Sequence, residues 1–266
     1  MISSQEEMFI RLGAFVLIFA VMAGLEIAFP RRPLKLPRAM RWSNNLGIVV
    51  INTLLLRLIF PILAVGVAFW AQINGWGLFN LIDLPVWAEI ALAVILLDLA
   101  IYAQHVAAHK IPLLWRLHQV HHADLDIDLT TGARFHPVEI WVSMLYKMAV
   151  VLLLGASPVA VVILEVVLNS LAMFNHANFA LPLAADRIIR KVLVTPDFHR
   201  VHHSVIRRET DSNYGFNLSI WDRMFGTYIA QPAKGHDDMS IGLESYRDKN
   251  TANIIWCLLL PFRRKG

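Results

Sequence analysis

The chain has 266 residues, of which 57% are hydrophobic and only 17% are charged, and its net charge is +4. A soluble domain usually carries about 25% charged residues, so this composition indicates a membrane protein. The modest positive charge does not indicate a nucleic-acid partner. The one cysteine, Cys257, excludes an intramolecular disulfide and a cysteine-based metal site.

Three stretches are apolar and long enough to cross a bilayer, which takes about 20 residues: 9–29, 46–71 and 84–104. Glu6 and Glu7 precede the first stretch, where a signal peptide would carry positive charge, so we expect a retained membrane helix. The second stretch contains Arg57 and Pro61, which predict either a kink or a paired arginine inside the membrane.

The segment between the first two stretches, 31–41, holds five basic residues and no acidic residue. The positive-inside rule places this loop in the cytoplasm. Loop 71–85 contains no Lys or Arg and fits the opposite side, so the third stretch returns to the cytoplasmic face. The basic segments 31–41 and 207–208 fit either an acidic electron carrier or anionic lipid headgroups, and we expect lipid for 31–41.

Ten of the eleven histidines lie between His105 and His203. Eight of them form three clusters, His105-x-x-x-His109, His118-x-x-His121-His122 and His199-x-x-His202-His203. Positions i, i+3 and i+4 share one face of a helix, so each cluster can aim two or three imidazoles at one point. Imidazole is a common ligand of iron, zinc, copper and nickel. Eight imidazoles exceed the needs of one ion, so the sequence predicts a two-metal site at the cytoplasmic face.

Two shorter apolar segments, 140–154 and 158–174, predict a helical hairpin that returns to the same side. The last apolar segment, 254–262, is too short to span and precedes Arg263–Lys265, so it predicts an interfacial helix. We therefore expect an all-α fold, with about three transmembrane spans plus the hairpin, and a cytosolic helical cap that carries the two-metal site. The chain is expected to form one membrane domain, 1–266, with anchor helices over 1–89, a histidine-motif region over 90–230 and a tail over 231–266.

The residues leave three functions open. An all-histidine site in an apolar chain favours an iron pair that activates dioxygen, with a lipid substrate arriving from the bilayer. A zinc-dependent membrane lipid hydrolase is the first alternative, although two-metal hydrolases usually include bridging Asp or Glu ligands. A membrane metal-binding or metal-transport protein is the second, although the clusters lie beyond the expected spans and not along a path through them.

The clusters occur in the order and spacing of the fatty acid hydroxylase/sterol desaturase superfamily, which the chain resembles over roughly residues 90–230. Segments Arg134–Glu139 and Trp221–Tyr228 also resemble signatures of that superfamily. The resemblance implies two non-haem irons, dioxygen as co-substrate and an external electron donor of ferredoxin, cytochrome or reductase type. It implies hydroxylation, desaturation or ether cleavage of a lipid, sterol-like or carotenoid substrate. The residues that match its ligand pattern are His105, His109, His118, His121, His122, His199, His202 and His203, with His176 as a further ligand.

Other candidates surround these histidines. His136 is either a ligand or part of a fixed turn before Pro137. A ligating imidazole usually donates its other N–H to a carboxylate or carbonyl, and the candidate carboxylates are Asp98, Asp124 and Asp197. For the two loop aspartates the alternative is a solvated loop or a helix cap. We expect His236 on the surface, residues 221–228 in structural packing, and Glu165 with Asn169 in a polar patch toward the metal centre or another helix.

The expected location is a bacterial inner membrane in preference to the endoplasmic reticulum, because the chain is compact and has no appended carrier domain or dilysine-type tail. The sequence also has no Gly-rich nucleotide fingerprint and no haem-attachment motif, so we expect electrons to come from another protein. The sequence predicts neither the substrate nor an oligomeric state.

Overall fold

The computed structural model describes residues 4–263, and within this range the protein is helical, with isolated β-bridges but no strand. The α-helices are α1 (Ser4–Ala28), α2 (Arg38–Ile59), α3 (Ala64–Ile73), α4 (Val86–Lys110), α5 (Pro112–His122), α6 (Pro137–Leu154), α7 (Pro158–His176), α8 (Leu183–Ile189), α9 (Pro196–His202), α10 (Arg207–Thr210), α11 (Ile220–Met224), α12 (Gly235–Asp238) and α13 (Ile254–Leu259). Short 3-10 helices are η1 (Leu78–Asn80), η2 (Thr131–Ala133), η3 (Lys249–Ala252) and η4 (Leu260–Phe262).

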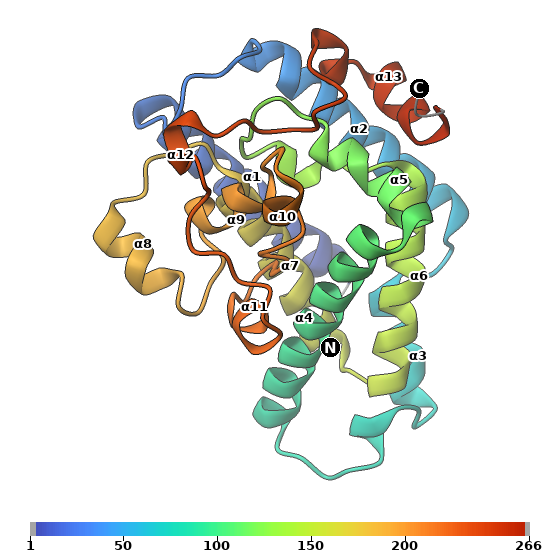
Figure 1. Cartoon of the computed structure of the whole chain (residues 1–266). Helices are drawn as coiled ribbons and strands as arrows, with labels where there is room; N and C mark the ends of the chain where they lie inside the picture. Colours follow the sequence, from blue (N-terminus) through green and yellow to red (C-terminus); the bar gives the residue numbers. More distant parts are fainter. Residues whose placement is uncertain (1–3, 264–266) are drawn as a thin grey trace.

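Five helical segments of the described chain are long and apolar enough to cross a membrane: Gln5–Ala28, Arg38–Asn80, Val86–Lys110, Pro137–Leu154 and Pro158–His176. They correspond to the three expected spans and the expected hairpin, and the short helices α8 to α12 lie together beside them (Figure 1). The predicted fold class is therefore confirmed. The second span is bent as Pro61 predicts, because α2 ends at Ile59 and α3 begins at Ala64.

The core between the long helices consists largely of small and branched apolar side chains. Ala64 and Ala68 of α3, Ala93 of α4 and Ala160 of α7 are at most 1% exposed and belong to one buried cluster. Small residues let membrane helices approach closely, which strengthens van der Waals packing where lipid provides no hydrophobic driving force. The hairpin between α6 and α7 turns at Gly155, whose φ of +65° favours glycine.

Three charged side chains from neighbouring helices of the bundle are paired with one another. Lys147 Nζ of α6 lies 2.6 Å from Glu165 Oε1 of α7, and Arg11 Nη2 of α1 lies 2.5 Å from Glu165 Oε2. The predicted polar patch at Glu165 therefore faces neighbouring helices and not the metal centre. Asn169 donates to the Glu165 carbonyl one turn earlier, so these groups are satisfied within the protein.

The C-terminal segment packs one face on the protein and exposes the other. Trp256 and Cys257 are buried with residues of α2 and α5, whereas Ile255 is 68% exposed and Phe262 is 65% exposed. This two-faced arrangement is compatible with the predicted interfacial helix. Of the basic residues expected to follow it, Arg264 and Lys265 lie outside the described residues.

Candidate metal centre

Four helices, α4, α5, α7 and α9, deliver nine buried imidazoles to one region. The end of α4 contributes His105 and His109, α5 contributes the second cluster, and α9 with its C-cap contributes the third. His176 is the last residue of α7. All nine side chains are at most 6% exposed, so the fold removes the entire set from solvent.

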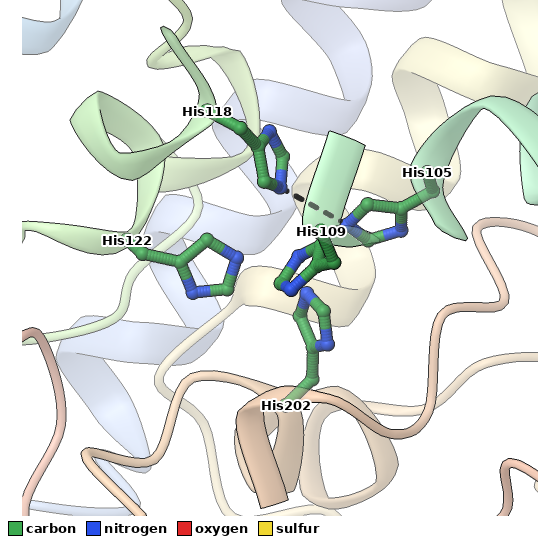
Figure 2. A group of neighbouring side chains, drawn as sticks. All are labelled: His105, His109, His118, His122 and His202. Carbon is green, nitrogen blue, oxygen red and sulfur yellow. Dashed lines mark hydrogen bonds between the residues drawn. The ribbon is translucent and has the colours of Figure 1, made fainter. Parts of the chain in front are cut away.

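The nine imidazoles divide into two groups, and within each group the candidate ligand nitrogens lie within 4.8 Å of one another. Group one is His105, His109, His118, His122 and His202, and group two is His121, His176, His199 and His203. Figure 2 shows the five side chains of group one converging from α4, α5 and α9. The structure therefore brings together all nine histidines that the sequence singled out as ligands.

Each H-x-x-H-H motif serves both groups, which differs from the expectation that one cluster aims at one point. His118 and His122, four residues apart on α5, enter group one, while His121 enters group two. On α9 the assignment is reversed, because His199 and His203 enter group two and His202 enters group one. Side chains four residues apart lie about one turn above each other on one helix face, whereas the i+3 side chain is rotated away from them.

Hydrogen bonds at Nδ1 fix the tautomer of several of these histidines. His105 Nδ1 lies 2.7 Å from the Tyr214 carbonyl oxygen, His202 Nδ1 lies 2.7 Å from that of Ser212, and His176 Nδ1 lies 2.8 Å from that of Ala172. A carbonyl oxygen only accepts, so Nδ1 carries the proton in each ring. The lone pair of a neutral ring is then on Nε2.

These lone pairs face one another in a way that fits bound cations. His105 Nε2 lies 3.2 Å from His118 Nε2, and His176 Nε2 lies 3.0 Å from His199 Nε2. In group one, the buried Nε2 atoms of His109, His122 and His202 have no hydrogen-bond partner among the described residues. Buried polar nitrogens are normally satisfied, and a divalent metal ion would satisfy several at once. The donor set therefore fits one metal ion in each group.

Burial keeps the imidazoles in the form that binds metal. Desolvation, followed by the proximity of other histidines, lowers the pKa of His121, His122, His199 and His203 well below the ordinary value. Desolvation likewise lowers the pKa of His202 to about 3. Only the neutral ring offers a lone pair to a metal, so both groups are ready to coordinate at neutral pH.

The carboxylates that contact the histidines are not the ones expected from the sequence. Glu139 Oε1 lies 2.6 Å from His118 Nδ1, and Asp211 Oδ1 lies 3.4 Å from His109 Nδ1. Glu139 lies within the Arg134–Glu139 segment, which is the one local signal that could have identified it. Asp211 is 102 residues from its histidine, and no periodicity links the two.

The three aspartates proposed to support the histidines bind other groups. Asp98 accepts hydrogen bonds from Trp221 Nε1, at 2.8 Å, and from the Leu218 backbone N–H. It therefore anchors the 218–221 segment, where Trp221 packs structurally as predicted. Asp197 pairs with Arg200, which lies beside His199 in the chain.

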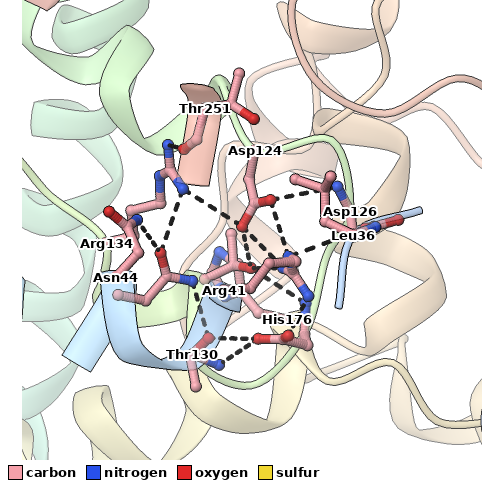
Figure 3. A network of polar contacts seen from close by, with 12 residues as sticks. Leu36, Arg41, Asn44, Asp124, Asp126, Thr130, Arg134, His176 and Thr251 are labelled. Carbon is pink, nitrogen blue, oxygen red and sulfur yellow. Dashed lines mark hydrogen bonds and ion pairs between the residues drawn. The ribbon is translucent and has the colours of Figure 1, made fainter. Parts of the chain in front are cut away.

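Asp124 binds Arg41 and forms the centre of a buried charge network (Figure 3). Arg41 also contacts Asp128, and all three side chains are at most 1% exposed. The arginine lowers the pKa of Asp124 to about 2, overcoming the opposing effect of burial. The solvated-loop alternative for Asp124 is therefore wrong, and this network fixes the loop between α5 and α6.

The prediction that segment 31–41 binds lipid headgroups is wrong for Arg41, because this residue is fully buried. Arg31 pairs with Asp197 and Asp237, and Arg32 donates to the Met239 carbonyl. Two cations of this basic segment therefore bind α9 and α12 and hold these short helices against the long ones.

His136 and His236 lie outside both groups. His136 caps α6, since its Nδ1 accepts from the Val138 backbone N–H and its Nε2 donates to the Leu258 carbonyl, in agreement with the turn alternative. The prediction that His236 is a surface residue is wrong, because it is only 7% exposed and its Nε2 lies 3.7 Å from Asp197 Oδ2. The packing of α12 on α9 buries it, and desolvation lowers its pKa to about 4.

Within residues 4–263, the fold and the site define a helical protein with five candidate membrane spans and two adjacent groups of buried histidines. The family model described as fatty acid hydroxylase matches residues 90–227, which include all nine grouped histidines. The chain belongs to the fatty acid hydroxylase family.

Named relatives of the chain include an ornithine lipid hydroxylase of Rhizobium tropici, 29% identical over 68% of this chain and 53% of that protein. The alkylglycerol monooxygenase of Xenopus tropicalis is 33% identical over 64% of this chain and 37% of that protein. A cholesterol 25-hydroxylase-like protein of Danio rerio is 28% identical over 53% of this chain and 55% of that protein. The chain thus spans about half or less of the length of these curated relatives. No solved structure matches the chain.

Proposed function

We propose that this chain is a membrane-bound non-haem di-iron oxygenase that uses dioxygen and external electrons to hydroxylate or desaturate a lipid or sterol-like substrate. The observation that carries the proposal is the division of nine buried imidazoles into two groups with facing nitrogens. The names of the relatives, which are hydroxylases and monooxygenases, support oxidative chemistry over hydrolysis or transport.

The residues of group one would hold one iron and those of group two the other. When bound, the iron pair supplies the reduction of dioxygen and the oxidation of a substrate C–H bond. An all-nitrogen donor set without thiolate suits iron, and zinc and copper are the competing metals. The two H-x-x-H-H motifs each reach both groups, so α5 and α9 together would set the spacing between the ions.

The surrounding residues orient and protect this centre. The Tyr214 and Ser212 carbonyls hold His105 and His202 in the tautomer that leaves Nε2 free. Glu139 accepts the Nδ1–H of His118, which raises the basicity of that ligand. Because the nine rings are at most 6% exposed, bulk water is kept from the reacting atoms.

We further propose that the centre lies at the cytoplasmic face of the membrane. The C-terminal end of α7, which carries His176, lies beside the segment that joins α1 to α2, since the Arg31 backbone N–H donates to the Asn178 carbonyl. That segment carries the positive charge that indicates the cytoplasmic side. A lipid substrate would then reach the centre laterally from the inner leaflet.

The first experiment measures metal content by elemental mass spectrometry on protein purified in detergent after anaerobic iron loading. We expect about two irons per chain for wild type, with fewer after His121→Ala in group two and after His202→Ala in group one. His136→Ala is the matched control, because this histidine is buried but lies outside both groups. It should retain the wild-type metal content.

The second experiment exposes the loaded protein to isotopically labelled dioxygen, a chemical reductant and total lipid extract, and follows the lipids by mass spectrometry. Incorporation of one labelled oxygen indicates hydroxylation, and loss of two hydrogens indicates desaturation. Lipid cleavage that needs neither dioxygen nor reductant would replace the proposal with a zinc hydrolase. Metal flux without oxygen consumption would replace it with a transport protein.

A further inference from the structure

Trp115 connects the outer surface of the protein to group one. This residue of α5 is half-buried, and its ring centroid lies 4.9 Å from that of His109 and 5.4 Å from that of His122. Both histidines belong to group one. The indole is therefore in van der Waals contact range of two candidate ligands and reaches toward solvent with its remaining surface.

A cationic side chain covers the outer side of this indole, and other exposed cations lie nearby in the chain or share its carboxylate partner. The Arg207 guanidinium carbon lies 4.9 Å from the Trp115 ring centroid, in a cation–π arrangement. The side chain of Arg207 is 57% exposed and that of Lys110 is 54% exposed, and Arg208, the next residue of α10, is also exposed. We call Lys110, Trp115, Arg207 and Arg208 the Trp115 face.

Asp211 ties this face to the histidines. Its Oδ2 lies 3.1 Å from Lys110 Nζ and 3.0 Å from Arg207 Nε, and its Oδ1 faces His109 Nδ1. The Arg207 guanidinium also donates to the His109 backbone carbonyl. A charged partner that binds the two cations would thus contact groups that are directly coupled to a candidate ligand.

We propose that the Trp115 face docks an acidic one-electron carrier protein and that Trp115 relays its electrons to group one. The proposal rests on the proposed oxygenase function. Exposed cations around a central aromatic ring complement an acidic protein surface and speed its association. An anionic lipid would be attracted by the same cations, but lipid binding gives no role to the ring contacts that run from Arg207 through Trp115 to the histidines.

The electron balance defines what the partner delivers. Insertion of one oxygen atom into a C–H bond consumes dioxygen, two electrons and two protons, and releases one water molecule. Two reduced carriers each lose one electron, so two docking events serve one turnover.

The test uses the full chain in nanodiscs of phosphatidylcholine and an acidic [2Fe–2S] ferredoxin as the probe. Arg208→Glu reverses an exposed charge of the face, and Lys249→Glu is the matched reversal at an exposed residue of η3. We expect Arg208→Glu to weaken ferredoxin binding roughly tenfold at low salt, with the difference shrinking as salt rises. Lys249→Glu should bind ferredoxin as wild type does.

The relay is tested separately at Trp115. At ferredoxin concentrations that saturate binding, Trp115→Leu should slow reduction by ferredoxin, expressed per bound iron, and Trp115→Phe should restore most of that rate. Each variant is also pre-reduced with dithionite and given one pulse of dioxygen. The product yield of that single turnover, expressed per bound iron, should fall less than the ferredoxin-driven rate does, because chemical reduction bypasses the carrier.

Three outcomes would overturn the proposal. Equal binding by Arg208→Glu and Lys249→Glu would show that the face is not the docking site. An effect of Arg208→Glu that appears only with anionic lipid in the nanodisc would assign the face to the membrane. Unchanged ferredoxin-driven reduction in Trp115→Leu would remove the relay. If pre-reduced wild type forms no product, the proposed function fails instead, while ferredoxin binding still reports on docking.

Discussion

Replacing Arg41 with methionine should destabilise the protein strongly. Arg41 Nε and Nη2 donate to the two oxygens of Asp124 at 3.0 and 2.8 Å, a third contact reaches Asp128, and Arg41 is 0% exposed. Methionine keeps much of the side-chain length but removes the cation that pairs with Asp128 and leaves the buried Asp124 with Arg134 alone, whose Nη1 lies 3.7 Å from Asp124 Oδ2. Removing one partner of a buried ion pair costs about 3–5 kcal/mol, a large share of a typical unfolding free energy of about 5–15 kcal/mol.

The measurement is thermal unfolding in detergent micelles at neutral pH. Each kcal/mol lowers Tm by roughly 2–4 °C for a chain of this size class, so we expect a fall of roughly 6–20 °C. Arg38→Met is the matched control, because Arg38 lies on the same turn of α2 and makes a cation–π contact to Trp42 at 5.9 Å. That contact contributes about 1 kcal/mol, so the control should change Tm by only a few degrees.

A double-mutant cycle with Asp124→Asn identifies the interaction responsible. Once the Asp124 carboxylate is neutralised, loss of the Arg41 cation should lower the unfolding free energy by less. The effects of the two substitutions on the unfolding free energy should therefore not be additive. If Arg41→Met unfolds at the same Tm as Arg38→Met, the reasoning is refuted. Strict additivity of Arg41→Met and Asp124→Asn would refute it as well.

Three further predictions concern the candidate metal centre. Glu139→Gln removes the charged acceptor of His118 and should weaken metal affinity by roughly 10–100-fold, as measured by competition with a chelator. Gly132→Ala places a Cβ 2.5 Å from a carbonyl oxygen of α7 and 3.1 Å from His176 Nδ1. It should therefore lower the unfolding free energy by about 1–3 kcal/mol and reduce the metal bound by group two. A variant with wild-type Tm and metal content would contradict this. The metal-free protein should lose stability as pH falls below about 6.5, because the pKa of His202 is lowered to about 3 in the fold and the unfolded chain then binds more protons. A Tm that stays constant between about pH 7.5 and about pH 5.5 would contradict that linkage.

Much of the architecture follows from apolar run length and from proline and glycine positions. The stretches 9–29, 46–71 and 84–104 each reach the length that a bilayer requires, and Pro61 predicts the break between α2 and α3. Gly155, followed by Pro158, predicts the turn of the hairpin. These features are local, so a single sequence carries them.

The supporting polar contacts could not be read in the same way. Asp98 lies two turns before His105 on α4, yet its carboxylate binds Trp221, because the 218–221 segment packs against that part of the helix. Glu139 and Asp211 reach the histidines from distant elements. A carboxylate binds whichever donor the fold brings within about 3 Å, and sequence separation does not reveal that donor.

The sequence by itself determined the spans and the eight clustered histidines, because hydropathy and helical spacing are properties of short segments. The ninth, His176, was predicted only from the resemblance to a family. Only the tertiary structure decided how those histidines divide. His121 and His122 are neighbours in the chain but belong to different groups. Adjacent residues on a helix point about 100° apart, so the packing of α4, α5, α7 and α9 around each side chain determines which group it joins.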